Sequence, residues 1–135
     1  MILLDTDICI EILRGNKEII ARREAVEEET AISFMTAAEL FYGAEKSAHP
    51  EENANLVNDF LLGIAVIGPD LAVLHRFGIL KAYLKKQGLP LLDADIFIAA
   101  VCFEKCDRIV TGNEVHFRRF KGLKIENWLS ERKRS

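Results

Sequence analysis

The sequence predicts an α/β fold in which a mainly parallel sheet of about five strands packs against helices. Two observations support this prediction. Short apolar runs alternate with longer stretches of helical periodicity, so successive strands are separated by segments long enough to form a helical crossover. The chain has 135 residues, of which 50% are hydrophobic, so we expect one domain with a substantial core.

Five segments are expected to form strands because they are short, apolar and tolerant of extended backbone. Glycine directly follows two of them, as is common where a strand ends in a turn. The predicted strands are Ile2–Leu4, Ala31–Phe34, Ile64–Ile67, Arg108–Thr111 and Leu123–Ile125.

Six segments are expected to form helices, and they fill the intervals between the strands. The last of them is apolar on nearly every side, which predicts a helix buried in the core. The predicted helices are Asp7–Arg14, Lys17–Glu28, Thr36–Ser47, Pro50–Leu62, Asp70–Gln87 and Asp93–Glu104.

The composition excludes several classes of protein. Charged residues make up 29% of the chain and the net charge is −3, which argues against disorder and against a wholly basic nucleic-acid surface. Contact with nucleic acid would therefore need local basic patches or a bound metal. The apolar runs stay below the roughly 18 residues of a membrane helix, and the N-terminus lacks the basic region of a signal peptide.

Three cysteines, Cys9, Cys102 and Cys106, are an odd number without disulfide spacing, which indicates reduced thiols in a cytoplasmic protein. We interpret them as small core residues rather than metal ligands. Residues 1–130 are expected to form the domain, followed by a basic tail, ERKRS, at residues 131–135.

Two polar side chains lie just after predicted strands. Asp5 comes after the first strand and Asn113 after the fourth, and ligands of open parallel sheets bind at such carboxyl ends. Each residue also has a structural interpretation. Asp5 could cap the next helix, although Asp7 is an alternative cap, and Gly-Asn is typical of a turn.

Glu39 lies near the carboxyl end of the second predicted strand. Its structural interpretation is a capping box, in which Thr36 caps the helix and Glu39 bonds back to the cap.

Asp93 and Asp95 precede the apolar run of the buried helix. Residues in a helix are separated by about 100° each, so the two side chains point to nearly opposite sides. We predict that Asp93 is the N-cap and that Asp95 lies in the first turn, where the helix dipole tolerates an acid. Because this helix is expected to be buried, Asp95 should be partly buried and in need of a cation or donors.

Asp5, Glu39, Asp95 and Asn113 thus come from the ends of four different elements. Carboxylates brought together without a countercharge repel each other and raise each other's pKa. A divalent cation relieves this repulsion, and ligands with oxygen donors alone suit Mg²⁺ or Mn²⁺.

Four motifs, in order, resemble those of the PIN-domain ribonucleases, and specifically the VapC-type toxins of toxin–antitoxin pairs. They are LLDTDICIEILRGN at the N-terminus, TAAELFYGA, the D-x-x-I-A-A pattern that begins at Asp95, and IVTGNEVHFRRFKGLKIENW near the end. The resemblance extends over nearly the whole chain.

The resemblance implies a central parallel sheet with helices on both faces and a Mg²⁺- or Mn²⁺-dependent endoribonuclease. It makes Asp5 and Asp95 the principal metal ligands, Glu39 the third acid, and Asn113 the fourth site residue. Thr111 would help to position water. Many family members have Asp where this chain has Asn113, so the resemblance leaves open whether one metal or two bind.

The resemblance also implies partners: an RNA substrate, a second copy of the chain in a homodimer, and a VapB-type antitoxin that folds into a hydrophobic groove. A local basic segment could contact the RNA backbone, although a solvated surface explains it equally well. It comprises Arg118, Arg119, Lys121 and Lys124. His116 receives no role.

Two alternatives remain open from the sequence. A haloacid-dehalogenase-type phosphatase also has a strand followed by D-x-D, as in ILLDTD, but its later acids follow the threonine motif, whereas Asp93 and Asp95 precede it. The other alternative is a non-catalytic PIN scaffold, which would have no need of Asp5, Glu39 and Asp95.

Overall fold

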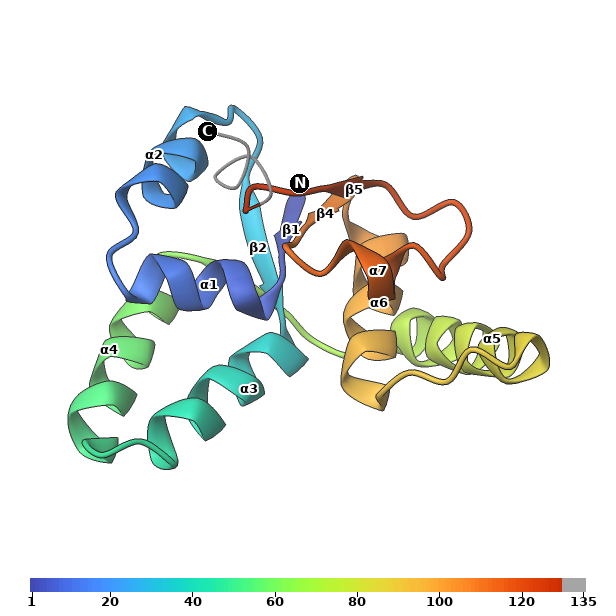
Figure 1. Ribbon diagram of the computed structural model, residues 1–135, viewed down its shortest axis with the longest axis horizontal. Helices are drawn as coiled ribbons and strands as arrows, with labels where there is room; N and C mark the ends of the chain where they lie inside the picture. The colour runs from blue at the N-terminus through green and yellow to red at the C-terminus, as the bar shows by residue number, and fades with distance from the viewer. Residues whose placement is uncertain (130–135) are drawn as a thin grey trace.

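The computed structural model describes residues 1–129 and contains a five-stranded sheet in which every pair of neighbours is parallel. The strand order is β3-β2-β1-β4-β5 (Figure 1). The strands are β1 (Ile2–Leu4), β2 (Thr30–Ser33), β3 (Ala65–Ile67), β4 (Arg108–Val110) and β5 (Ile125–Glu126). The predicted fold class is therefore confirmed, whereas the expected basic tail at 131–135 lies outside the described residues.

All six predicted helices form, and a short seventh was not predicted. They are α1 (Thr6–Leu13), α2 (Lys17–Ala25), α3 (Phe34–Glu45), α4 (Pro50–Leu62), α5 (Leu71–Gln87), α6 (Asp93–Lys105) and α7 (Glu114–Phe117). One turn of helix is too short to produce a recognisable apolar period, which explains why α7 was missed. Within residues 1–129 there is no helix both long and apolar enough to span a membrane.

Helices cover both faces of the sheet, because alternate residues of each strand point to opposite sides (Figure 1). Leu3 and Ile109 belong to a buried cluster with α5 and α6. Ile2, Leu4 and Val110 belong to a second cluster with α1, α2, α3 and α4. The two cores hold the carboxyl ends of β1 and β4 side by side, with Leu4 opposite Val110 in the register.

Helix α6 is the most buried helix of the fold, as its sequence predicted. Ile96 and residues 98–102 are at most 1% exposed. On its remaining side, Phe97 stacks on Phe77 of α5 with ring centroids 4.0 Å apart, and Phe34 meets its edge at 5.4 Å. This packing fixes the position of the first turn of α6, which carries Asp95.

Two predicted helix caps are wrong. Helix α3 begins at Phe34, two residues earlier than expected, and its N-cap is Ser33, whose Oγ accepts the Thr36 N–H at 3.0 Å. Thr36 is therefore inside the helix and forms no capping box with Glu39. Because β2 ends one residue earlier than predicted, Ser33 reaches the cap position first.

The predicted cap at Asp93 is also wrong. Leu92 occupies the N-cap position of α6 without a side-chain hydrogen bond, and Asp93 and Asp95 both lie in the first turn. The Asp93 carboxylate instead accepts a hydrogen bond from Lys81 of α5 at 3.0 Å. Cys9 and Cys102 are buried free thiols, as expected of core residues, and Cys106 is partly buried.

Candidate active site

The candidate residues come from four segments that meet at the carboxyl ends of the central strands. Asp5 directly follows β1, and Asn113 lies between β4 and α7. Glu39 is in the second turn of α3, which begins where β2 ends, and Asp95 is in the first turn of α6. This edge of the sheet is where ligands of open α/β folds bind.

Asp5 is 5% exposed, and both of its carboxylate oxygens are hydrogen-bonded. Oδ1 accepts the Thr6 N–H at 2.8 Å, and Oδ2 accepts the Thr111 hydroxyl at 2.7 Å. Asp5 is also the N-cap of α1, so the capping interpretation is confirmed, and it does not conflict with a role in the site. Each oxygen keeps a further lone pair that is free for a cation.

Burial raises the pKa of Asp5 to about 7, with further increases from the charges of Asp7 and Asp95. The hydrogen bonds from Thr111 and Thr6 act in the opposite direction. A carboxyl group that is this costly to ionise gains free energy when a cation is placed beside it. Of these two charges, Asp95 contributes the smaller increase.

Thr111 is fully buried and links β4 to the site. Its hydroxyl donates to Asp5, and its oxygen accepts the Asn113 N–H at 2.9 Å. The resemblance implied that Thr111 would position water. In this structure its proton is directed to the Asp5 carboxylate, which this hydrogen bond orients.

Glu39 is joined to the same region through Thr6. Its Oε1 accepts the Thr6 hydroxyl at 2.7 Å, and the Thr6 and Thr36 hydroxyl oxygens lie 3.0 Å apart. The capping box, the structural interpretation of this side chain, is thus not formed, and Glu39 is directed to the start of α1.

Asp95 is held more loosely. Its side chain is 18% exposed, and burial raises its pKa while nearby His116 lowers it. The His116 Nδ1 lies 3.5 Å from Oδ2 of Asp95 and 2.8 Å from Nδ2 of Asn113. The imidazole of His116, which had no assigned role, therefore lies between two of the candidate residues.

Asp7 was considered as a helix cap and as the second acid of a phosphatase D-x-D motif, yet it holds the turn that carries Thr111 and Asn113. Its Oδ2 accepts the Gly112 N–H and its Oδ1 accepts the Ile8 N–H, each at 2.8 Å. A Cβ at Gly112 would lie 2.8 Å from Asp7 Oδ2 and closer still to Leu129 Cδ1, so any larger residue would force these side chains to shift. The D-x-D spacing was the available signal for Asp7.

The residues present fit a hard divalent cation such as Mg²⁺ or Mn²⁺. Among residues 1–129, no three His, Cys, Asp or Glu side chains are grouped as a complete metal cage. Mg²⁺ does not need one, since it commonly binds one or two carboxylates and keeps several waters. Asp5 and Asp95 would supply such a pair, since burial disfavours the charged form of Asp5 unless a cation lies beside it.

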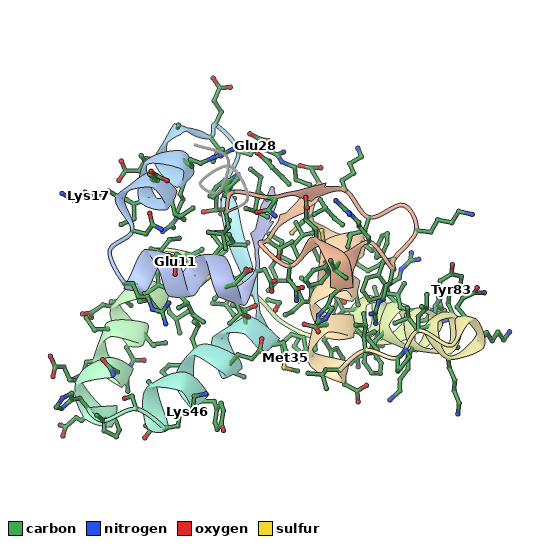
Figure 2. All side chains as sticks on the ribbon, viewed as in Figure 1. Glu11, Lys17, Glu28, Met35, Lys46 and Tyr83 are labelled. Atoms are coloured by element: carbon green, nitrogen blue, oxygen red, sulfur yellow. The ribbon has the colours of Figure 1, made fainter. Side chains whose placement is uncertain are left out.

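A groove of about 620 Å³ opens beside Glu39 between α1, α3 and α4. Thr6 and Glu39 line its inner end, and exposed apolar side chains lie farther out on α3 and α4. Its lining includes Leu13, Tyr42, Lys46, Leu56 and Val57. In Figure 2, Lys46 lies at the end of α3 opposite Met35.

Comparison with known proteins places this geometry in a family. The PIN domain model matches residues 2–123. Ribonuclease VapC2 of Haemophilus influenzae is 36% identical over 128 residues, covering 94% of this chain and 97% of that protein. The tRNA(fMet)-specific endonuclease VapC of Shigella flexneri is 35% identical over 127 residues, covering 93% and 96%.

Solved structures agree. The VapBC2 complex of Rickettsia felis, bound to a DNA fragment from its promoter, contains a chain that superposes with a TM-score of 0.88 at 30% identity, covering 95% of this chain and 99% of that one. The chain therefore belongs to the PIN-domain family, among the VapC ribonucleases.

Proposed function

We propose that this protein is a divalent-metal-dependent endoribonuclease and the toxin of a toxin–antitoxin pair. The observation that carries the proposal is Asp5, buried at the carboxyl end of β1 with a pKa raised to about 7 and with Asp95 nearby. In a chain of the VapC family, such a pair of carboxylates is best explained as a site for Mg²⁺ or Mn²⁺.

In this mechanism Asp5 and Asp95 hold the cation, and Glu39 contributes directly or through water. The bound cation would supply acidity to a water molecule and neutralise phosphate charge. Thr111 and Thr6 keep both oxygens of Asp5 oriented, so that few rotamers compete with the binding geometry. Asn113, the fourth site residue, adds no charge, and its side chain contacts His116.

Transfer RNA is the first substrate to test, because the Shigella flexneri relative is named as a tRNA(fMet)-specific endonuclease. The net charge of −3 makes general attraction to RNA weak, so the cation must supply local attraction. Within the basic segment, Arg118 pairs with Glu114 and Arg119 donates to the Pro90 carbonyl, whereas Lys121 and Lys124 are exposed. These two lysines are the better candidates for phosphate contacts.

The test is cleavage of purified tRNA in Mg²⁺ or Mn²⁺, with and without EDTA. We expect Asp5→Ala and Asp95→Ala to reduce cleavage to background and Glu39→Gln to impair it, because each removes a ligand charge. Asp93→Ala is the matched control, since Asp93 lies in the same first turn of α6 as Asp95 but pairs with Lys81. Undiminished cleavage in EDTA would contradict the proposal.

Two further measurements separate this proposal from the non-catalytic scaffold and from the phosphatase. Metal-independent binding of RNA without cleavage would support the non-catalytic scaffold. Release of inorganic phosphate from small phosphate esters would support the phosphatase, although both oxygens of Asp7, the second acid of that D-x-D motif, already accept backbone hydrogen bonds.

We further propose that the groove between α1, α3 and α4 binds a segment of a VapB-type antitoxin, because related VapC chains are found in VapBC complexes. Apolar side chains of the segment would contact Leu56 and Val57, and a basic side chain would suit Glu39 at the inner end. Occupation of the groove would then reach the candidate site.

Leu56→Lys should abolish co-purification with the co-expressed antitoxin and leave tRNA cleavage intact. Leu62→Lys is the matched control, because Leu62 is 87% exposed on the same helix and is not part of the groove lining. Equal loss of the complex in both variants would exclude this groove as the binding site. Light scattering of the purified chain would check the expected homodimer.

A further inference from the structure

Thr6 contacts two acids of the candidate site, Asp5 and Glu39, with two different groups. Its backbone N–H donates to Oδ1 of Asp5 at 2.8 Å, and its side-chain hydroxyl lies 2.7 Å from Oε1 of Glu39. These acids come from segments 34 positions apart, one after β1 and one in α3. Thr6 is thus the direct hydrogen-bonded link between them.

The direction of this link follows from counting protons. A hydroxyl carries one proton, and a carboxylate can only accept, so the proton of Thr6 is directed to Glu39. The Thr36 hydroxyl oxygen lies 3.0 Å from the Thr6 hydroxyl oxygen, and the Ser33 Oγ lies 3.3 Å from the Thr36 hydroxyl oxygen. Thr36 must then donate to Thr6, and Ser33 must donate to Thr36. This gives an ordered chain of hydrogen bonds from Ser33 through Thr36 and Thr6 to Glu39.

The first two hydroxyl groups of this hydrogen-bond chain are held in fixed positions. Ser33 and Thr36 are fully buried, and the Ser33 Oγ accepts the Thr36 N–H as the cap of α3. A hydrogen bond to a charged acceptor is stronger than one between neutral groups, and successive hydroxyls polarise one another. The Glu39 carboxylate is therefore oriented by residues of its own helix terminus as well as by Thr6.

We propose that Thr6 is a positioning residue that sets the placement of Glu39 relative to Asp5 for metal binding. The inference rests on the proposed function, because it assigns Glu39 to the cation site. Thr6 does not itself touch the reacting atoms. Its backbone contact with Asp5 survives any side-chain substitution, so the hydroxyl contact with Glu39 can be tested separately.

The test is a titration of the purified protein with Mn²⁺ in the absence of RNA, in which free Mn²⁺ is measured by electron paramagnetic resonance. Thr6→Val keeps the shape and removes the hydroxyl, and it should weaken Mn²⁺ binding by about tenfold. Thr6→Ser keeps the hydroxyl and should bind as the native protein does. Thr30→Val is the control, since Thr30 lies at the other end of β2 and its hydroxyl oxygen accepts the Arg23 Nε–H at 3.2 Å.

Native-like Mn²⁺ affinity in Thr6→Val would overturn the inference, as would an equal loss in Thr6→Ser. The route through Glu39 is tested by adding Thr6→Val to Glu39→Ala. The double variant should bind Mn²⁺ no more weakly than Glu39→Ala alone, and additive losses would overturn the inference.

A metal-free measurement separates this inference from the proposed function. If the native protein bound no Mn²⁺ and cleaved no RNA, the proposed function would fail. Thermal unfolding of the same single and double variants in EDTA would still decide whether Thr6 and Glu39 are coupled: losses in Tm that do not add support the link, and losses that add refute it.

Discussion

The two aspartates of the proposed cation site are held in opposite ways. Asp5 is almost fully buried, and each of its oxygens accepts a hydrogen bond shorter than 3 Å. Asp95 is partly exposed, and the His116 nitrogen lies 3.5 Å from its oxygen. Asp5 therefore depends on individual partners, whereas Asp95 depends on the packing of the whole of α6.

The two aspartates should differ most in how far Mn²⁺ affinity falls when the side chain that contacts each of them is removed. Thr111→Val removes the hydroxyl that orients Asp5 and should weaken Mn²⁺ binding by about 10- to 100-fold. His116→Ala should weaken it less, because the histidine lies at the limit of contact with Asp95. Titration with Mn²⁺ measures both, with Thr111→Ser as the control. Equal losses in the two variants would show that the aspartates are held alike.

Asp5 and Asp95 should differ less in their effect on how the stability of the fold depends on pH. Burial raises the pKa of Asp5 to about 7 in the folded state, whereas an unfolded Asp titrates at about 3.9. The folded state thus retains its proton longer, so stability is lost as the pH rises through this interval and remains lost above it.

Asp5→Asn removes this loss. In EDTA it should raise Tm by several degrees at about pH 8 and by much less at about pH 5. Asp95→Asn should show the same trend more weakly, because Asp95 is only partly buried. Calorimetry at the two pH values checks this, and a gain that did not depend on pH would contradict the assignment to burial.

The smallest effect is expected at Asp93, which shares the first turn of α6 with Asp95. Asp93 and Lys81 form a surface ion pair whose side chains are 57% and 53% exposed. Asp93→Ala should change the free energy of unfolding by less than about 1 kcal/mol and leave Mn²⁺ affinity unchanged. Chemical denaturation and the Mn²⁺ titration measure these values. A loss of metal affinity would mean that Asp93, rather than Asp95, faces the cation.

The strands and helices were predictable because their signals are local. Apolar runs, glycine and proline stops and helical periodicity locate each element within a few residues. The placement of Asp5 at a carboxyl end needed only the strand before it. The caps of α3 and α6 were not predictable to the residue, because Ser33 and Thr36 are both good caps and the end of β2 decides between them.

The side-chain bonds of the site depend on register between distant segments. Thr111 and Asp5 are 106 positions apart, Gly112 and Asp7 are 105 apart, and Thr6 and Glu39 are 33 apart. No local pattern distinguishes a threonine that bonds a buried carboxylate from one that faces water. The sequence therefore predicted candidate residues for the chemistry but not the residues that orient them.

The long separation between Asp5 and Thr111 has a consequence for synthesis of the protein. At about 5–20 residues per second, a ribosome adds the threonine seconds after the aspartate. During that interval β4 is missing, β1 lacks one of its two neighbours, and Asp5 lacks the hydroxyl that orients it. A ribonuclease of the proposed kind would therefore have an incomplete site until β4 is made and pairs with β1.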